Sequence, residues 1–352
     1  MGRRLAIAAG LMLFSASAAV ADSVAEFYKG NQIRFIIRSG VGGGYDQYAR
    51  LLGRHIGRHI PGNPSVLPVN MPGGGGIVAA NYVAVRAPRD GSILTIVSQG
   101  LPVDQALGLN KSFQADLREF NWIGNLSNSN QVLVTWHTAK TKSLDDLMKR
   151  ETLIGATGAG SISVQMPSFL NNIVGTKIKI VFGYPNGGDV NIAMERGEVE
   201  GRSTNPWASY KAVTPQYISE KKIIPILQMG LTKDPDLPNV PLMRDLAKTP
   251  EQKLVLDYMS KSVAVGRPIA TTPGVPKERV AALRAAFDAT LVDPQFKSEA
   301  DKQRAEINPM TGAELEQIVR ELIEAPQSVR DKVKTAMERP QDAKKIPRKK
   351  KE

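Results

Sequence analysis

One pattern of apolar and polar positions recurs four times along the chain: a short apolar run, a glycine-rich loop, and then a segment with helical spacing. The apolar runs predict strands at Arg34–Ile37, Val66–Val69, Thr152–Ile154 and Ile178–Val181. The segments after the loops predict helices at about 45–60, at 77–85, from 161 through Leu170, and at 189–196. Because strands that alternate with helices build mostly parallel sheets, the pattern predicts an α/β fold.

The positions of the four units divide the chain into two parts. Two units lie near the start and two near the middle, which predicts two similar α/β lobes, each a mostly parallel sheet flanked by helices. A chain of 352 residues exceeds one hydrophobic core, and a hydrophobic content of 42% is enough to build two. In sheets of this kind the ligand lies beyond the carboxyl ends of the strands, which is where the glycine loops are.

The loops of the first two units contain residues suited to an anion. These residues are Ser39, Gly42, Gly43 and Gly44 in the first loop and Gly74, Gly75 and Gly76 in the second. The start of a helix offers unpaired backbone N–H groups and a positive dipole end, and glycine lets a ligand approach the backbone closely. Four such loops around one cleft would bind a carboxylate, or a dicarboxylate with one charge facing each lobe. The alternative is that the glycines only form tight turns.

Polar side chains beside the loops complete the candidate site, and each also has a structural alternative. These candidates are Tyr45, Asp46, Thr157, Ser161, Ser163, Tyr184, Asp189, Arg202, Ser203 and Thr204. Asp46 is placed either to cap its helix or to orient a ligand. The hydroxyl groups could cap helices or hold a carboxylate, and the two tyrosines could line the cleft or pack. Arg202 could pair with a carboxylate through two parallel hydrogen bonds, or lie on the surface.

The first residues predict export. Arg3 and Arg4 precede an apolar run from Leu5 to Phe14, and small residues lead to a cleavage position after Ala21, as in a secretory signal. The run is shorter than the roughly 20 residues of a membrane span. A buried N-terminal helix is the alternative. At the other end, the lysines and arginines between residues 344 and 351 predict a solvated tail.

Several other functions lack the residues that they need. Residues 40–45 approach a dinucleotide fingerprint, but a tyrosine occupies the third glycine position and no acidic residue follows at the required distance. The chain has neither a Gly-Lys-Ser/Thr phosphate loop nor a Gly-x-Ser-x-Gly nucleophile turn. His55 and His59 lie one helical turn apart, but the arginines at positions 54 and 58 would repel a metal ion. The sequence has no cysteine, which excludes disulfides and thiol chemistry. We therefore predict no cofactor and no metal.

The net charge of +12 could also attract nucleic acid. Most lysines and arginines are scattered, however, and only 6% of the residues are aromatic, whereas single-strand binding needs stacking platforms. We predict no nucleic-acid partner.

Between residues 34 and 91 the chain resembles the extracytoplasmic solute receptors of tripartite tricarboxylate transporters, the Bug type. The markers are a Gly-Gly-Gly-x-Asp loop at Gly42–Asp46, a Pro-Gly-x-Gly-Gly loop at Pro72–Gly76 and a Pro-x-Asp-Gly turn at Pro88–Gly91. Later segments that also resemble the family are Gly155–Ser161, Gly183–Asp189, Asp236–Pro241 and Pro268–Leu291. The likeness extends to about Ala300. Two departures touch the expected pocket. Tyr45 stands where many members have a threonine, and Val164–Met166 occupies a stretch that often contains a histidine.

The resemblance implies a periplasmic two-lobed clamp, the Venus-flytrap fold, with two crossing segments between the lobes. It implies that the first two glycine loops hold one ligand carboxylate, largely through backbone N–H groups and ordered water, and that the middle loops hold the other end. The partner would be an integral membrane permease of one large and one small subunit. We expect a signal peptide at 1–21, a first lobe at 22–126 and 229–325, a second lobe at 127–228, and a C-terminal basic tail at 326–352.

The predicted function is therefore that of a monomeric periplasmic protein without catalytic activity. It would capture a di- or tricarboxylate or a similar organic acid by closing its cleft, and deliver it to the permease. Two alternatives remain open at this stage: a sensory receptor that presents its ligand to a signalling membrane protein, and an exported α/β enzyme that acts on small acids.

Overall fold

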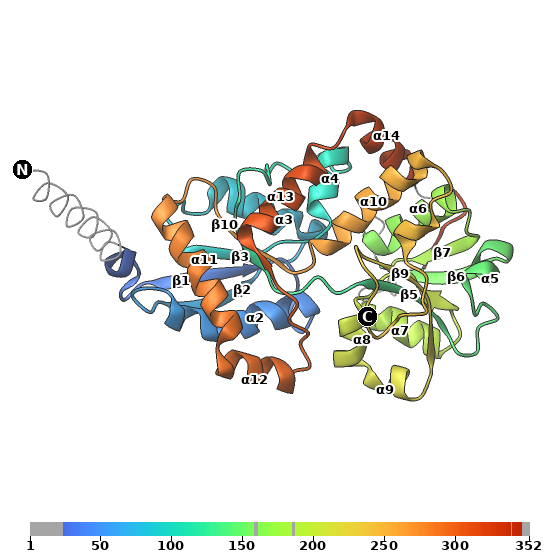
Figure 1. The fold of residues 1–352 in the computed structure, drawn as a ribbon, viewed down its shortest axis with the longest axis horizontal. Helices are drawn as coiled ribbons and strands as arrows, with labels where there is room; N and C mark the ends of the chain where they lie inside the picture. The colour runs from blue at the N-terminus through green and yellow to red at the C-terminus, as the bar shows by residue number, and fades with distance from the viewer. Residues whose placement is uncertain (1–23, 158–160, 185–186, 339, 347–352) are drawn as a thin grey trace, which may run out of the picture.

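Two six-stranded sheets, each flanked by helices, form two lobes that lie side by side (Figure 1). The computed structural model describes residues 24–157, 161–184, 187–338 and 340–346. The expected signal peptide at 1–21 and the basic residues 348–351 lie outside the described residues. The two helix-flanked sheets confirm the predicted α/β fold class.

The first lobe is built on a sheet with the strand order β11-β4-β10-β3-β1-β2. Its strands are β1 (Gln32–Ile37), β2 (Ser65–Asn70), β3 (Ile93–Ile96), β4 (Asn121–Asn125), β10 (Pro268–Thr271) and β11 (Met310–Thr311). Its helices are α2 (Gly44–Ile56), η1 (Gly57–His59), η2 (Gly74–Gly76), α3 (Ile77–Asn81), η3 (Tyr82–Arg86), α4 (Leu101–Leu107), α11 (Lys277–Val292), α12 (Pro294–Lys302) and α13 (Gly312–Ile323). Strand β1 is parallel to β2 and β3, whereas β10 is antiparallel to β3 and β4.

The second lobe is built on a sheet with the order β12-β7-β6-β8-β5-β9. Its strands are β5 (Gln131–Trp136), β6 (Thr152–Ala156), β7 (Ile178–Phe182), β8 (Gly201–Arg202), β9 (Ile223–Met229) and β12 (Lys344–Lys345). Its helices are α5 (Leu144–Lys149), α6 (Ile162–Ile173), α7 (Gly187–Glu195), α8 (Trp207–Val213), α9 (Pro215–Ser219), η4 (Met243–Leu246), α10 (Pro250–Ala264) and α14 (Gln327–Ala336). Strands β12, β7, β6 and β8 are parallel, and β5 runs against β8 and β9.

The central strands read as largely apolar runs because most of both faces is buried. In β1, Ile33, Phe35 and Ile37 face the core under α2 and α11, while Ile36 faces the core on the other side of the sheet. Successive side chains of a strand point to opposite faces, so an apolar residue at every position gives a strand covered on both sides. Leu133 in β5 belongs to the same core as Ile36, so apolar packing is continuous between the lobes.

The four predicted strand–loop–helix units are all present. The strands are β1, β2, β6 and β7, and the helices are α2 continued by η1, α3 continued by η3, α6 and α7. Strands β1 and β2 are parallel neighbours, and so are β6 and β7. The two glycine loops of each lobe therefore leave the same edge of the same sheet.

The chain passes from the first sheet to the second between β4 and β5, and returns between α10 and β10. The two crossing segments are hydrogen-bonded to each other, with Arg267 N donating to Ser127 O at 2.9 Å and Leu126 N donating to Arg267 O at 3.2 Å. The return lies later than the sequence suggested. A bridge between Gln228 and Leu242 keeps the residues after β9 beside the second sheet.

The C-terminal segment differs from the solvated tail that its charge suggested. Residues Gln327–Ala336 form α14, which packs on α6, α10 and α4 (Figure 1). Val333 is fully buried there, and Ala336 and Met337 lie close beside it in the core. Further on, β12 pairs in parallel with β7, and Ile346 N donates to Phe182 O at 2.9 Å. The interpretation as a tail was wrong for these residues because it counted charges and overlooked the apolar stripe of the helix.

Candidate ligand-binding site

The first glycine loop is held in place by Asp46. Gly43 is the N-cap residue of α2 and makes no side-chain cap, and the buried Asp46 carboxylate accepts a hydrogen bond from Gly42 N at 2.9 Å. The same carboxylate accepts from Arg50 Nε and from Asn70 Nδ2, both at 2.8 Å. Asn70 also donates to the carbonyl oxygen of Ser39 at 2.8 Å. Asp46 thus ties the loop to its own helix and to the end of β2, which differs from the helix cap that the sequence favoured.

The ionised form of Asp46 is stabilised in this setting. Burial by itself raises the pKa of the carboxyl group, but the hydrogen bonds from Gly42, Asn70 and Arg50 outweigh it and hold the pKa below its usual value. A negative charge in the first turn also suits the positive end of the helix dipole.

Tyr45, the residue that departs from the family pattern, contacts two arginines through its ring. The guanidinium carbon of Arg38 lies 4.2 Å from the centre of the Tyr45 ring, and that of Arg267 lies 4.5 Å from it. The Tyr45 hydroxyl accepts a hydrogen bond from Gln99 N at 3.2 Å. The ring therefore packs within the first lobe, where it positions two cations at the carboxyl ends of β1 and β3.

The second glycine loop adopts a backbone that only glycine takes readily. Gly73, Gly74, Gly75 and Gly76 have φ values of 139°, 55°, 70° and 110°. Arg38 Nη1 donates to Gly75 O and to Ser98 Oγ, both at 2.7 Å, and so links this loop to the end of β3. Gly74 and Gly75 are exposed. The loop thus presents open backbone beyond the carboxyl end of β2.

In the second lobe, three predicted hydroxyl residues form one cluster at the start of α6. Ser161 Oγ and Ser163 Oγ are 2.7 Å apart, and Thr157 Oγ1 lies 3.0 Å from the first and 3.1 Å from the second. Thr157 N donates to Ser163 Oγ at 3.0 Å. Ser203, which is fully buried, donates to the carbonyl oxygen of Ser163 at 2.9 Å. The structure therefore brings three of the predicted residues together, with Ser203 beneath them, and their role in ligand binding stays a prediction. Thr204 is buried as well.

The remaining candidates of the second lobe gather around α7. Arg202 Nη1 donates to Gly187 O at 3.2 Å and to Asn191 Oδ1 at 3.0 Å. Burial lowers the pKa of Arg202, although Tyr210 and Tyr217 act in the opposite direction. Tyr184 is buried, and its pKa is raised first by that burial and then by Glu198. Asp189 lies in the first turn of α7. These contacts place Arg202 under the start of α7, away from the surface.

Two residues near the first loop were missed by sequence reasoning. Gln99 follows β3 and Arg267 precedes β10, and β10 is antiparallel to β3, so both lie at the edge of the sheet where the glycine loops lie. Both are 8% exposed. A small cavity of about 10 Å³ lies beside them, and Pro206, Ala208 and Ser209 of the second lobe also line it. A charged residue directly flanking a buried strand was the signal that could have identified Arg267.

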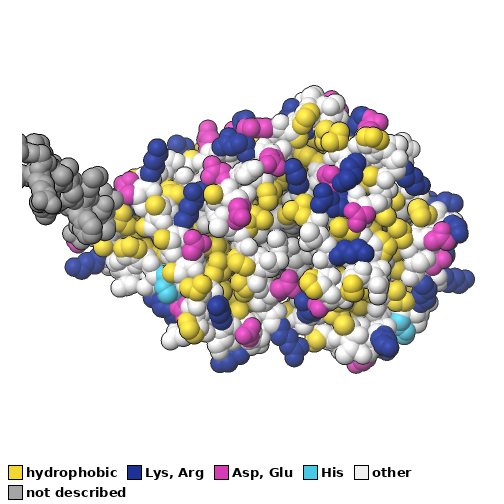
Figure 2. All heavy atoms as spheres, viewed as in Figure 1, with side chains coloured by type: hydrophobic (Ala, Val, Ile, Leu, Met, Phe, Trp, Pro, Cys, Tyr) yellow, Lys and Arg dark blue, Asp and Glu magenta, His cyan; other side chains and the backbone are white. Residues whose placement is uncertain are grey.

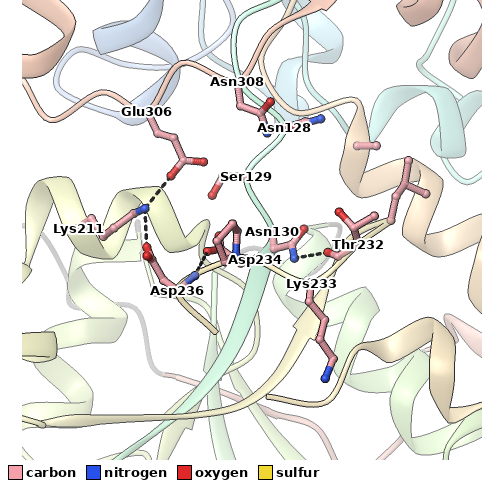
Figure 3. A pocket seen from close by; sticks show the side chains of 13 residues that line it. Asn128, Ser129, Asn130, Lys211, Thr232, Lys233, Asp234, Asp236, Glu306 and Asn308 are labelled. Atoms are coloured by element: carbon pink, nitrogen blue, oxygen red, sulfur yellow. Dashed lines mark hydrogen bonds and ion pairs between the residues drawn. The ribbon is translucent and has the colours of Figure 1, made fainter. Parts of the chain in front are cut away.

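A larger cavity of about 340 Å³ lies at the crossing segments (Figure 3). Lys211 of α8 is placed between two acids there, with its Nζ 2.8 Å from Asp236 Oδ2 and 3.0 Å from Glu306 Oε2. The contact with Glu306 joins the two lobes. None of the residues predicted for the site lines this cavity.

The two histidines of α2 and η1 pair with acidic residues. His55 Nε2 contacts Glu299, and His59 Nε2 lies 2.8 Å from Asp293. Within the described ranges no group of three or more His, Asp or Glu could hold a metal ion, and no helix is long and apolar enough to cross a membrane. On the face shown in Figure 2, basic and acidic side chains are intermixed over both lobes.

The fold of the chain is similar to that of several solved proteins, among them periplasmic binding proteins. Structural neighbours of the chain include the periplasmic binding protein BugD, with a TM-score of 0.65 at 19% identity over 91% of this chain and 100% of that one. Another is the R. palustris protein Rpa4515 with adipate, with a TM-score of 0.64 at 19% identity over 86% of this chain and 97% of that one. A third is MatC from Rhodopseudomonas palustris with bound malate, with a TM-score of 0.63 at 20% identity over 86% of this chain and 99% of that one. At these identities the likeness confirms the predicted fold.

Sequence comparison agrees over a shorter stretch. The UPF0065 protein in the tcbD–tcbE intergenic region of Pseudomonas sp. strain P51 is 28% identical over 149 residues. That match covers 42% of this chain and 43% of the relative, so the chain matches less than half the length of that protein. No protein-family model matches the chain.

Proposed function

We propose that this chain is an extracytoplasmic solute receptor of the tripartite tricarboxylate transporter type. It captures a small carboxylated solute, a di- or tricarboxylate or a similar organic acid, and delivers it to a two-subunit membrane permease. The observation that carries the proposal is the pairing of glycine loops on adjacent parallel strands, β1 with β2 and β6 with β7. Adipate and malate in the neighbouring structures support the class of ligand.

The two lobes have complementary tasks in this proposal. The exposed backbone of Gly43, Gly74 and Gly75 donates N–H groups to one carboxylate of the ligand, and the hydroxyl cluster around Ser161 holds the other end. Binding begins on the first lobe, and a hinge motion at the crossing segments then brings in the second. Arg202 and Ser203 support the second-lobe loops from below, since both donate to backbone oxygens there.

The remaining parts of the proposal follow from the sequence. Residues 1–21 direct export and are removed, the protein acts in the periplasm as a monomer, and it returns its ligand unchanged. Removal of residues 1–21 takes away Arg3 and Arg4, so the full-chain net charge of +12 becomes +10 (12 − 2), which raises the local concentration of acids near the surface.

A thermal-shift screen of the purified protein against mono-, di- and tricarboxylates tests the proposal. A ligand that binds only the folded state adds about 2.7 kcal/mol of stability at one hundred times its dissociation constant. We expect one or a few acids to raise the melting temperature and to be recovered unchanged. A flat response to every acid, or conversion of the bound acid to a product, would contradict the proposal.

A matched pair of serine variants tests the site. Ser161→Ala removes a hydroxyl group from the cluster and should weaken binding of the acid. Ser143→Ala removes a hydroxyl group that caps α5, another helix start in the same lobe, where Asp146 N donates to it at 3.1 Å. The control should lower stability by about 1 kcal/mol and leave affinity unchanged. Equal affinities in the two variants would exclude Ser161 from the site.

A further inference from the structure

Arg267 is buried without a partner for its charge. The side chain is 8% exposed, and its guanidinium carbon lies 4.5 Å from the centre of the Tyr45 ring and 5.5 Å from that of Tyr48. Its Nε is buried and unpaired, and within the described ranges the guanidinium donates no hydrogen bond and forms no ion pair. A buried charge costs several kcal/mol unless a counter-charge meets it. Packing on two rings compensates only part of this cost.

A second positive group lies directly beside this guanidinium. A Cβ atom built on Gly44, the first residue of α2, would lie 3.3 Å from Arg267 Nη2. The N-terminus of the 13-residue helix α2 and the arginine therefore lie together, although the helix dipole disfavours a cation there. Two positive groups at one point, with no acid paired to the arginine, form an environment that favours an anion.

A buried polar atom on the neighbouring strand end faces the same cavity. Gln99 is 8% exposed, its Oε1 is buried without a partner, and both Gln99 and Arg267 line the cavity of about 10 Å³ between the lobes. That volume holds about one water molecule, so the lobes must separate before an acid can enter. Buried polar groups normally have partners, so unpaired ones at a single cavity indicate a ligand.

We propose that Arg267 binds a carboxylate group of the solute, at a subsite formed with Gln99 and the N-terminus of α2. This inference rests on the proposed function and identifies its charged contact. A planar guanidinium can hold a carboxylate through two parallel hydrogen bonds, and the Tyr45 ring fixes the plane of the guanidinium. The tyrosine that departs from the family pattern thus has a role as the platform for the arginine.

Arg38, the second arginine that stacks on Tyr45, has a different role. Its Nη1 already donates to Gly75 O and Ser98 Oγ, so it positions the second glycine loop. Burial lowers the pKa of Arg38, and the nearby charge of Arg267 lowers it further. An anion at Arg267 would relieve the repulsion between the two guanidinium groups, which favours the occupied site.

Titration calorimetry of the full chain and three variants tests the proposal, with adipate, malate, sulfate and inorganic phosphate as the probes. We expect wild type to bind at least one of the two dicarboxylates. Arg267→Gln should weaken that binding by about 30-fold or more, as loss of one partner of a buried charge pair does. Arg267→Lys keeps the charge but loses the fork geometry, and should give an intermediate loss. Arg279→Gln is the matched control, because Arg279 also stacks on a ring, that of Phe27, at 3.6 Å. Its affinity should stay within about twofold of wild type.

The melting temperatures without ligand provide a second measurement. Because Arg267→Gln removes an uncompensated buried charge, its ligand-free form should be as stable as wild type or more stable. A folded Arg267→Gln protein that binds the acid as tightly as wild type would overturn the inference and leave the proposed function intact. A wild type that binds neither dicarboxylate would overturn this inference, and the proposed function would fall with it only if the thermal-shift screen also showed no response to any acid. Binding of sulfate or phosphate alone would overturn the assignment to a carboxylate.

Discussion

Replacing Asp46 by asparagine separates a structural role for this residue from a ligand-binding one. The substitution keeps the shape of the side chain and removes its charge. In the protein the carboxylate accepts three hydrogen bonds, from Gly42 N, Arg50 Nε and Asn70 Nδ2, and its side chain is 4% exposed. An asparagine can accept from only part of this set, since one of its two terminal atoms becomes a donor.

The expected loss of stability follows from these contacts. One donor is left facing an N–H group, and a buried unsatisfied donor costs about 1–3 kcal/mol. The other two hydrogen bonds lose their charge assistance, which costs about 1 kcal/mol more. We therefore expect Asp46→Asn to lower the free energy of unfolding by about 2–4 kcal/mol. For a lobe of this size that corresponds to a fall in melting temperature of roughly 5–15 °C.

Differential scanning calorimetry as a function of pH gives the full test. Because the pKa of Asp46 is lower in the folded state than its unfolded value of about 3.9, its contribution to stability is present above that value. The contribution is lost as the pH falls through the folded pKa. The difference between wild type and Asp46→Asn should therefore be constant above about pH 5 and shrink at lower pH.

A control substitution measures the effect of charge alone. Asp145→Asn removes an exposed carboxylate that pairs with Lys149, and should change stability by less than about 0.5 kcal/mol. If Asp46→Asn were as mild as the control at neutral pH, or if its effect did not depend on pH, the reasoning about the Asp46 network would be refuted. A loss of ligand affinity without any loss of stability would instead assign Asp46 to the ligand.

Three further predictions concern the hinge and the C-terminal segment. Gly266→Ala should lower stability by about 2–5 kcal/mol, because φ is +54° and the new Cβ would lie 1.9 Å from Ser127 O; an unchanged melting temperature would refute this. Glu306→Gln breaks the partly exposed pair with Lys211 and should cost at most about 1 kcal/mol by calorimetry, so a loss above 3 kcal/mol would show that the pair is a main tie between the lobes. Val333→Ala should cost about 1.5–3 kcal/mol in urea unfolding because this side chain is fully buried, whereas a solvated tail would show no change.

The parts of this protein that could be predicted from sequence are those fixed by local rules. Strands β1, β2, β6 and β7 could be located because apolar runs end at glycine loops. The placement of Thr157, Ser161 and Ser163 around one helix start could also be predicted from their spacing, whereas their mutual hydrogen bonds came from the structure. The local role of Asp46 was harder, because its partner Asn70 comes from a different strand.

The parts that could not be predicted depend on long-range pairing. Arg267 lies beside Tyr45 only because β10 runs antiparallel to β3, and nothing local to residue 267 indicates that register. The same reason applies to α14. Its apolar stripe is short, and it can be recognised as a buried face only from its packing against α6 and α10. The run of basic residues after α14 suggested a solvated tail, although Lys344 and Lys345 are exposed residues of the paired strand β12.

The order of strands in the two sheets also determines when each lobe can form during synthesis. In the first sheet β4 pairs with β10 and β11, which come from residues 268–271 and 310–311. In the second sheet the edge next to β7 is completed by residues 344–345. A ribosome releases the chain from its N-terminus, so β4 waits for most of the polypeptide before it finds its partners. Pairings between strands that are distant in sequence form slowly, so the nascent chain stays unfolded for longer. Loss of the segment between residues 268 and 311 would therefore prevent the first lobe from folding, although most of that lobe lies in the N-terminal third of the chain.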